Sequence, residues 1–570
     1  MRKYLLYILL ILHSNLAWAQ KDTGPWPGAF NYTINKTAVA TNGAVVSAHP
    51  LASMVGLSIL QQGGNAFDAA IATQLTLAVV FPQAGNLGGG GFLVATRPKG
   101  DNIAIDYREM APSKASRDMY LDEKGEADTK KSQDGHLSSG VPGTVAGLFE
   151  TYKYASLPFP ALIEPAIRLA EYGFALSERQ ARALNSIQVD LQKNNSFLPV
   201  FFRTQPWKKG DTLIQKDLAL TLKRIRDSGA KGFYDGETAR LIVEEMERGK
   251  GIISLNDLKA YKAIERRAYQ FNYNGYEIVS MPLPSSGGIL IHQMLKMIEG
   301  RKIAAMGFHS PESVQLMTEV ERRAFADRGE YLGDADQYHV PVNLLTNDLY
   351  LKDRMKNFIP GQATPSSEIK PGVLLKPESM ETTHLNVIDK EGNAVSVTTT
   401  LNNSYGSKTV VAGAGFFMND EMDDFSIKPG QPNMYGAIGG MANAIAPGKR
   451  MLSSMTPTIV LKDGNPFIIT GTPGGTTIPT SVFQTIVNLI DFRLSPEEAI
   501  NAPKFHHQWL PDELQIEKGF PEEVKKKLEA MGYKIKILGG IGRTELIMAV
   551  PKGGYKLVAD DRGEDDARGY

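Results

Sequence analysis

The stretch 382-TTHLNVIDKEGNAVSVTTTLNN-403 decides the fold class of this 570-residue chain. The segments THLNVID and AVSVTTTLN are rich in β-branched residues, which favour strands, and 389-DKEGN-393 between them is typical of a turn. The sequence therefore predicts a β-hairpin here, with further strands in TPTIVLKDG and NPFIITGTPGG.

Helical patterns surround these strands. Residues 51–80 place small and apolar side chains at helical spacing, and the break at Gly63-Gly64 divides them into two predicted helices. Residues 161–260 are mostly amphipathic, and shorter helices are expected at 477–492 and 496–503. This mixture of long helical stretches and antiparallel hairpins predicts an α+β fold built in layers.

The start of the hairpin raises a chemical question. The preceding segment, 360-PGQATPSSEIKPGVLLKPESM-380, is typical of an exposed, mobile chain. If the bond between Glu381 and Thr382 were cut, Thr382 would carry a free α-amine with an ordinary pKa of about 7.7–8.0. Such an amine can act as the base that activates the hydroxyl of its own residue. On the local residues alone, a threonine-rich strand edge without chemistry is the favoured interpretation.

Composition excludes several classes of function. Lys plus Arg and Asp plus Glu are both 62, and no basic block stands out, so no nucleic-acid partner is expected. The chain has no cysteine, which excludes disulfides, thiolate nucleophiles and cysteine-based zinc sites. In 85-GNLGGGGFLVATRP-98 no Lys-Ser/Thr follows the glycines, so close approach of backbone layers is predicted rather than a phosphate loop. The adjacent His506 and His507 point opposite ways on an extended chain, and we expect no metal there.

The first residues have the pattern of a secretory signal peptide. Arg2 and Lys3 precede an apolar run over 4–12, and Ala17-Trp18-Ala19 is a typical cleavage site, so residues 1–19 are predicted to be removed. The alternative, a membrane anchor, needs a longer apolar run. We therefore expect an exported protein, periplasmic or secreted, with no stable membrane anchor after signal removal.

Several motifs resemble those of one enzyme family. The run 382-TTHLNVIDKEGNAVSVTTTLNNSYG-406 closely resembles the γ-glutamyltranspeptidase motif that begins with the nucleophilic threonine. Other segments resemble the family's motifs in the same order along the chain: 106-DYREMAP-112, 139-SGVPGTVAG-147, 419-NDEMDDF-425, 433-NMYGAIGG-440, 450-RMLSSMTPTIV-460, 471-GTPGG-475 and 502-APKFHHQWLPDEL-514.

The resemblance implies a fold and a maturation step. The fold is that of N-terminal nucleophile (Ntn) hydrolases, a four-layer αββα sandwich of two antiparallel sheets between helices. Self-cleavage between Glu381 and Thr382 would give a large subunit, 20–381, and a small catalytic subunit, 382–570. Both would remain interlocked in one domain as a heterodimer.

The resemblance also assigns roles to individual residues. Thr382 matches the nucleophile, Thr400 the threonine whose hydroxyl bonds to it, and Gly474 and Gly475 the pair whose N–H groups stabilise the oxyanion. Other residues match the family's substrate-binding set. Those that would bind the α-carboxylate of the substrate are Arg108, Ser453 and Ser454, and those that would bind its α-ammonium are Asn402, Glu421 and Asp424. Tyr435 lies in the segment that resembles the lid loop and would cover the pocket. Taken singly, Arg108, Glu421 and Asp424 are also compatible with surface salt bridges and solvated acids.

Three departures from the family pattern leave acceptor preference open. Asn386 stands where the family usually has Ser or Thr, and Thr472 stands where Ser is common. The stretch 539-GGIGRTELIMAV-550 also differs from most members.

The implied function is that of an exported γ-glutamyltransferase and glutathione hydrolase. It would act on glutathione and other γ-glutamyl compounds, with water, amino acids or dipeptides as acceptors and no cofactor. Two alternatives remain: a related acylase acting on β-lactams or other amides, and an inactive binding protein that is never cleaved.

Overall fold

The computed structural model describes residues 24–98, 100–369, 382–428 and 440–570. The predicted signal peptide, Glu381 and the lid residue Tyr435 lie outside these ranges. Within them, no helix combines the length and the apolar character needed to cross a membrane.

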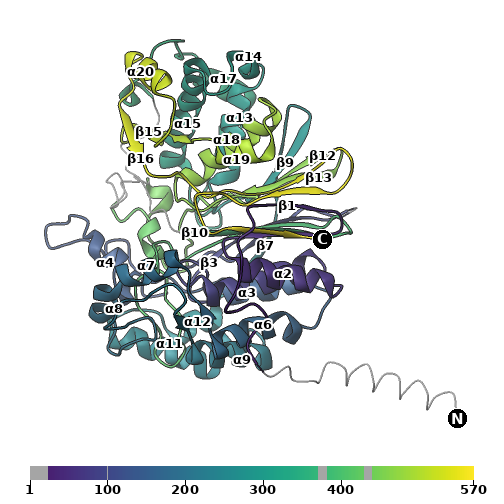
Figure 1. Ribbon diagram of the computed structural model, residues 1–570. Coiled ribbons are helices and arrows are strands. Elements are labelled where there is room, and N and C mark those ends of the chain that lie inside the picture. The colour runs from purple at the N-terminus through teal and green to yellow at the C-terminus, as the bar shows by residue number, and fades with distance from the viewer. Residues whose placement is uncertain (1–23, 99, 370–381, 429–439) are drawn as a thin grey trace.

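Two seven-stranded antiparallel sheets form the centre of the molecule (Figure 1). One has the order β19 (Asp566–Gly569), β2 (Ala44–Ser47), β10 (Thr382–Ile388), β11 (Ala394–Thr400), β3 (Gly90–Thr96), β4 (Ile103–Asp106) and β7 (Ile264–Arg267). The other has the order β1 (Thr37–Ala40), β18 (Tyr555–Val558), β17 (Glu545–Ala549), β13 (Asn465–Gly471), β12 (Thr458–Lys462), β9 (Tyr276–Ser280) and β8 (Tyr269–Tyr273).

Helices cover the outer face of each sheet (Figure 1). On the side of β10 lie α2 (Pro50–Gln61), α3 (Ala66–Val80), α5 (Thr144–Tyr152), α6 (Phe159–Tyr172), α9 (Lys216–Ser228) and α11 (Gly236–Arg248). On the side of β13 lie α13 (Gly287–Ile298), α15 (Pro311–Tyr331), α18 (Thr477–Ile490), α19 (Pro496–Asn501) and α20 (Glu522–Ala530). The expected four-layer αββα sandwich is therefore confirmed.

Shorter elements complete the described chain. They are α4 (Thr129–Gln133), η1 (His136–Ser138), β5 (Phe174–Ala175), α7 (Glu178–Ser186), α8 (Gln188–Asn194), β6 (Thr212–Leu213), α10 (Lys231–Tyr234), α12 (Leu255–Ala260), α14 (Ile303–Met306), α16 (Val342–Leu345), α17 (Asp348–Arg354), η2 (Ser366–Glu368), η3 (Glu421–Asp424), η4 (Met441–Asn443), β14 (Phe505–His506), β15 (Leu514–Glu517) and β16 (Ile535–Leu538).

The predicted hairpin is present as β10 and β11. Its register pairs Ile388 with Ala394 next to the turn and Thr382 with Thr400 at the open end. All residues of both strands are buried because helices cover one face and the second sheet covers the other. Between the sheets, Val46 and Phe92 pack in one apolar cluster with Ile388 and Ile469, so chain from before and after residue 381 shares a core.

Glycines allow the layers to approach closely beside this hairpin. A Cβ atom at Gly89 would lie 2.1 Å from the carbonyl oxygen of Thr400, and one at Gly91 would lie 2.4 Å from that of Thr398. The interpretation of the glycine run as a close backbone approach is confirmed.

The segment before the hairpin is only partly as expected. Residues 370–381 lie outside the described ranges. In the described part, Pro360 and Gln362 are exposed, but Ser366 is buried, and its backbone carbonyl accepts a hydrogen bond from Trp509 Nε1 at 2.9 Å. The prediction that the whole segment is exposed was therefore wrong for Ser366.

Candidate active site

A cavity opens where the ends of β10 and β11 meet the loops between the sheets. It is lined by Arg108, Thr382, Thr400, Asn402, Glu421, Asp424, Ser453, Ser454, Met455 and Gly475. All of them except Met455 belong to the predicted set, although they come from five separate motifs of the chain. Of the remaining predicted residues, Gly474 directly precedes Gly475 and Tyr435 lies outside the described ranges.

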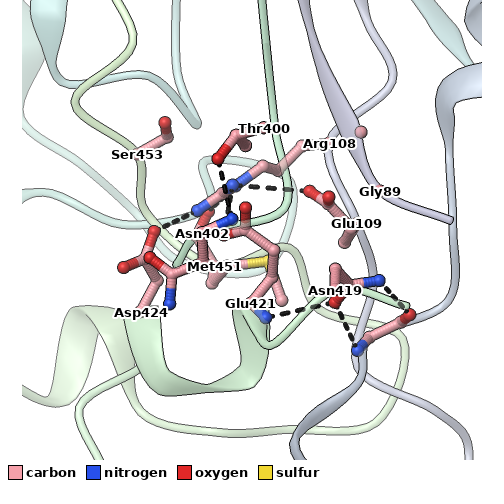
Figure 2. Close-up of polar contacts among 12 residues, drawn as sticks. Gly89, Arg108, Glu109, Thr400, Asn402, Asn419, Glu421, Asp424, Met451 and Ser453 are labelled. Atoms are coloured by element: carbon pink, nitrogen blue, oxygen red, sulfur yellow. Dashed lines mark hydrogen bonds and ion pairs between the residues drawn. The ribbon is translucent and has the colours of Figure 1, made fainter. Parts of the chain in front are cut away.

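Thr382 is the first residue of β10 and lies directly opposite Thr400. The Thr400 hydroxyl oxygen accepts a hydrogen bond from the backbone N–H of Asn402 at 2.8 Å (Figure 2). Asn402 has a φ of 75°, a left-handed conformation that asparagine tolerates better than most residues, and its side chain donates to the carbonyl of Asp420 at 3.0 Å. The chain reversal after β11 therefore orients Thr400 and Asn402 together toward the cavity.

Arg108 follows β4 and is completely buried, so the interpretation as a surface salt bridge is wrong. Its guanidinium contacts Glu421 at 2.6 Å and Glu109 at 3.4 Å, and its other arm pairs with Asp424 (Figure 2). The Nε–H also donates to the carbonyl of Met451 at 3.3 Å. One cation is therefore shared among three carboxyl groups.

Burial controls the protonation of these acids. It raises the pKa of Glu109 to about 7, although Arg108 acts in the opposite direction. Burial likewise holds the pKa of Glu421 well above its usual value, with Arg108 again lowering it. A site that keeps such carboxyl groups next to a cation is suited to a zwitterionic ligand, which can replace internal ion pairs with its own charges.

Asn419 fixes the loop that carries the acids. Its side-chain oxygen accepts from the backbone N–H groups of Gly140 at 2.8 Å and Glu421 at 3.1 Å (Figure 2). Its amide nitrogen donates to the carbonyls of Gly88 at 2.7 Å and Gly140 at 2.9 Å. Sequence reasoning did not single out this residue, although it begins the motif NDEMDDF.

The glycine pair lies at the N-terminus of α18. Gly474 and Gly475 have φ angles of 138° and 57°, and their carbonyls accept from the N–H groups of Thr477 and Ile478, both at 3.1 Å. Unpaired N–H groups and the helix dipole make this end of a helix favourable for negative charge. The arrangement suits the stabilisation of a developing oxyanion.

His384 is not arranged as a catalytic base. It is buried on β10, and burial lowers its pKa to about 3. Its ring nitrogens lie 2.9 Å from the Thr398 hydroxyl and 3.0 Å from the Asn386 side-chain oxygen. The side-chain amide of Asn386 also donates to the carbonyl of Glu545, in β17 of the other sheet, at 3.0 Å. Asn386, which replaces the usual Ser or Thr of the family, therefore links His384 to the other sheet.

The other two departures contact each other. The Thr472 hydroxyl donates to the carbonyl of Pro473 at 2.8 Å and accepts from the backbone N–H of Arg543 at 2.7 Å. The Arg543 guanidinium in turn lies 3.5 Å from the carbonyl oxygen of Thr382. The unusual stretch 539–550 therefore reaches the first residue of β10.

The histidine pair has structural contacts. The Nδ1 atom of His506 lies 2.9 Å from the Thr480 hydroxyl, and Arg322 lies 2.9 Å from His507 Nε2. Among the described residues, no group of three or more His, Cys, Asp or Glu side chains is arranged to hold a metal ion.

Comparisons with known proteins identify relatives of this chain. Residues 52–570 match the family model described as "Gamma-glutamyltranspeptidase". The chain is 48% identical over 530 residues to the "Glutathione hydrolase proenzyme" of Escherichia coli (strain K12), covering 92% of this chain and 91% of that protein. The structure resembles the cephalosporin acylase from Bacillus halodurans, with a TM-score of 0.82, 26% identity and coverage of 97% and 99% of the two chains. The gamma-glutamyltranspeptidase of Helicobacter pylori is 44% identical with a TM-score of 0.57, over 60% of this chain and 97% of that one.

Proposed function

The chain belongs to the gamma-glutamyltranspeptidase family, and from that premise we propose that it cleaves the γ-glutamyl amide of glutathione and related compounds. It is a γ-glutamyltransferase and glutathione hydrolase that passes the acyl group to water or to the amine of an amino acid or dipeptide. The observation that carries this proposal is the cavity, where a threonine at a strand end meets an arginine, two serines and two acids.

Maturation would generate the nucleophile. We expect removal of residues 1–19, export, and self-cleavage between Glu381 and Thr382 into fragments 20–381 and 382–570. The description of the E. coli relative as a proenzyme agrees with such processing. The two fragments would stay associated as a heterodimer because β10 pairs with β2 from the large fragment as well as with β11 from the small one.

The reaction then has two halves. The free α-amine of Thr382 takes the proton from its own hydroxyl, and the oxygen attacks the γ-carbonyl carbon of the substrate. The N–H groups of Gly474 and Gly475 stabilise the oxyanion. The C–N bond breaks as the leaving amine takes the proton, which leaves a γ-glutamyl ester on Thr382. Water or an acceptor amine attacks this ester, and the threonine oxygen regains a proton.

The substrate's amino-acid head accounts for the other residues. Its α-carboxylate would accept hydrogen bonds from Arg108, Ser453 and Ser454, and its α-ammonium would donate to Asn402, Glu421 and Asp424. The ion pairs from Arg108 to Glu421 and Asp424 would then be exchanged for ion pairs with the ligand. Tyr435 would screen this pocket from the lid loop.

Replacement of Thr382 tests the proposal. Thr382→Ala should remain a single chain on a denaturing gel and should not hydrolyse glutathione. Thr383→Val is a matched control because Thr383 is the next residue, equally buried, and its hydroxyl has no hydrogen-bond partner among the described residues. This control should mature and turn over normally. A Thr382→Ala protein that still matured and hydrolysed glutathione would contradict the assignment.

The acylase alternative has its own support in the likeness to a cephalosporin acylase. Rates on γ-glutamyl and glutaryl anilides separate the two functions because only the first substrate carries the α-ammonium that Glu421 and Asp424 would bind. Faster turnover of the glutaryl compound would favour the acylase. A wild-type chain that stayed intact after export would favour an inactive binding protein.

A further inference from the structure

The first turn of α18, which follows the glycine pair, is hydrogen-bonded to a segment from beyond α19. Thr476 and Thr480 lie four residues apart, so their side chains share one face of the helix. The Thr476 hydroxyl donates to the side-chain oxygen of Gln508 at 2.8 Å, and the Thr480 hydroxyl lies 2.9 Å from His506 Nδ1. The sequence assigned no role to Gln508.

Thr476 directly follows Gly475 and is the N-cap residue of α18, yet its hydroxyl makes no cap hydrogen bond. A threonine at this position usually accepts from the backbone N–H two or three residues further on. Here the third residue is Pro479, which has no N–H, and the N–H of Ile478 already donates to the carbonyl of Gly475 at 3.1 Å. The hydroxyl of Thr476 is therefore used outside its own helix, as a donor to Gln508.

The side-chain amide of Gln508 is oriented at both of its ends. Its oxygen accepts from Thr476 and lies 3.0 Å from His506 Nε2, and its nitrogen donates to the carbonyl of Leu510 at 3.3 Å. Because an amide oxygen can only accept, the Nε2 atom of His506 carries a hydrogen and donates it to Gln508. Gln508 and Thr476 are 2% and 3% exposed, so water has little access to the hydrogen bond between them.

The glycine pair needs anchors on both of its sides. Gly474 and Gly475 have positive φ angles and no side chains, so their own conformations are weakly restricted. On the side of β13, the hydroxyl of Thr472 fixes the chain through two hydrogen bonds. On the side of α18, the hydrogen bond from Thr476 to Gln508 ties the turn to another part of the chain. Donors stabilise an oxyanion from about 2.7–3.1 Å, so a small displacement of their N–H groups weakens catalysis.

We propose that Gln508 is a positioning residue for the oxyanion donors and that, through Thr476, it holds the N–H groups of Gly474 and Gly475 in place. This role rests on the proposed function of the cavity and adds to it a residue that does not touch the substrate. The oxyanion forms only as the acyl group is transferred, so loss of the contact should lower kcat and leave KM nearly unchanged. Both halves of the reaction form an oxyanion, so hydrolysis and transfer to an acceptor amine should fall by the same factor.

Two substitutions of Thr476 test this role in the mature enzyme with γ-glutamyl p-nitroanilide. Thr476→Val removes the hydroxyl and keeps the shape of the side chain, whereas Thr476→Ser keeps the hydroxyl. In Thr476→Val, kcat should fall about 3- to 10-fold, the range expected for the loss of one hydrogen bond, with KM within about twofold of wild type. Thr476→Ser should restore kcat to within about twofold of wild type.

A double variant tests whether Gln508 acts through this hydrogen bond. Gln508→Met removes the acceptor and should lower kcat about 3- to 30-fold, because buried donors lose their partner. The double variant Thr476→Val, Gln508→Met should lose no more than the larger of the two single losses, whereas independent effects would multiply. Thr485→Val is the matched control, because it removes a buried hydroxyl from the same helix that donates to the carbonyl of Ser481 at 2.9 Å. It should leave kcat within about twofold of wild type.

The outcomes separate this role from the proposed function. Equal losses of kcat in Thr476→Val and Thr485→Val, multiplied losses in the double variant, or a loss that lies in KM would each overturn the role of Gln508. If Gln508→Met fails to fold, the comparison of Thr476→Val with Thr476→Ser decides. A Thr476→Val chain that stayed intact while Thr476→Ser matured would also overturn it, because the contact would then serve self-cleavage rather than turnover. A wild-type enzyme that did not turn over the γ-glutamyl anilide would overturn the proposed function instead.

Discussion

Removal of the buried guanidinium of Arg108 should destabilise the chain in a manner that depends on pH. Arg108→Met would leave Glu109, Glu421 and Asp424 beside an apolar side chain, where one buried cation now contacts all three. Breaking a buried ion pair by removing one partner costs about 3–5 kcal/mol, because the remaining charge is uncompensated. We propose to measure every variant in the Thr382→Ala background, so that all are compared as single uncleaved chains.

The size of the chain converts this energy into a temperature. An unfolding entropy of about 2.1 cal/mol/K per residue gives about 1.2 kcal/mol/K for 570 residues. The expected fall in Tm at pH 8 is therefore about 2.5–4 °C. The double variant Arg108→Met, Glu421→Gln should recover about half of it, because Glu421 is the carboxyl group held 2.6 Å from the missing guanidinium.

The sign of the pH dependence follows from the direction of the pKa shifts. Burial already raises the pKa values of Glu109 and Glu421 above those of the unfolded chain, and loss of Arg108 removes the effect that lowers them. The folded protein then binds more protons than the unfolded one, so stability is highest at acidic pH and is lost as pH rises. The fall in Tm should shrink to about 1 °C at pH 5.

An exposed arginine provides the control. Arg240 on α11 also pairs with two carboxylates, Glu237 and Glu244, but its side chain is 52% exposed. Arg240→Met should shift Tm by less than about 1 °C at either pH, because exposed ion pairs contribute little. An Arg108→Met shift no larger than this, or one that is equal at pH 5 and pH 8, would refute the account of a shared buried cation.

Three other measurements test the remaining parts of the site. Gly474→Ala would place a Cβ atom 2.4 Å from the Thr477 hydroxyl oxygen and so disturb the oxyanion donors. In steady-state assays kcat should fall about 10²- to 10³-fold. A loss below tenfold would show that the glycine pair does not take part in catalysis. In the mature enzyme, kcat/KM should fall as pH drops below about 7.7–8.0, because the Thr382 amine becomes protonated. Burial lowers the pKa of His384 to about 3, so His384→Gln should leave the midpoint of that pH profile in place, and a shifted midpoint would identify the histidine as the base. Asn386→Ser removes the hydrogen bonds to His384 and Glu545. The free energy of unfolding should fall by about 1–3 kcal/mol, which lowers Tm by about 1–3 °C, and kcat/KM should stay within threefold of wild type. An unchanged Tm would show that these hydrogen bonds do not stabilise the fold.

Local chemistry explains what the sequence could predict. The hairpin of β10 and β11 follows from a turn sequence and two β-branched segments, which are all contained within 25 residues. The two helices at 51–80 follow from the spacing of their small and apolar residues and from the break at Gly63-Gly64, and the structure adds that Asn65 and Asp68 cap α3. These signals depend on neighbouring residues, so no knowledge of the rest of the fold is needed to read them.

Long-range contacts explain what the sequence could not predict. Motif resemblance assigned Arg108, Glu421 and Asp424 to a ligand, but it contained no information about the ion pairs that these residues make with one another. The hydrogen bond from Arg328 on α15 (Pro311–Tyr331) to the Ser454 hydroxyl, at 3.0 Å, is another such contact. It spans 126 positions, and a charged residue on a helix is normally interpreted as part of a solvated surface.

The position of Thr382 agrees with the proposed cleavage directly before it and with its proposed role as the nucleophile. A nucleophile must be held firmly, yet a strand that begins at a new chain end would normally fray. Here β10 pairs with β11 from Thr382 onward and with β2 from Leu385 onward, and the carbonyl of Thr382 lies 3.5 Å from the guanidinium of Arg543, in the loop before β17. The contacts that order the threonine are therefore independent of the peptide bond to Glu381. Cleavage of that bond would free the α-amine while the sheet continues to hold the residue that carries it.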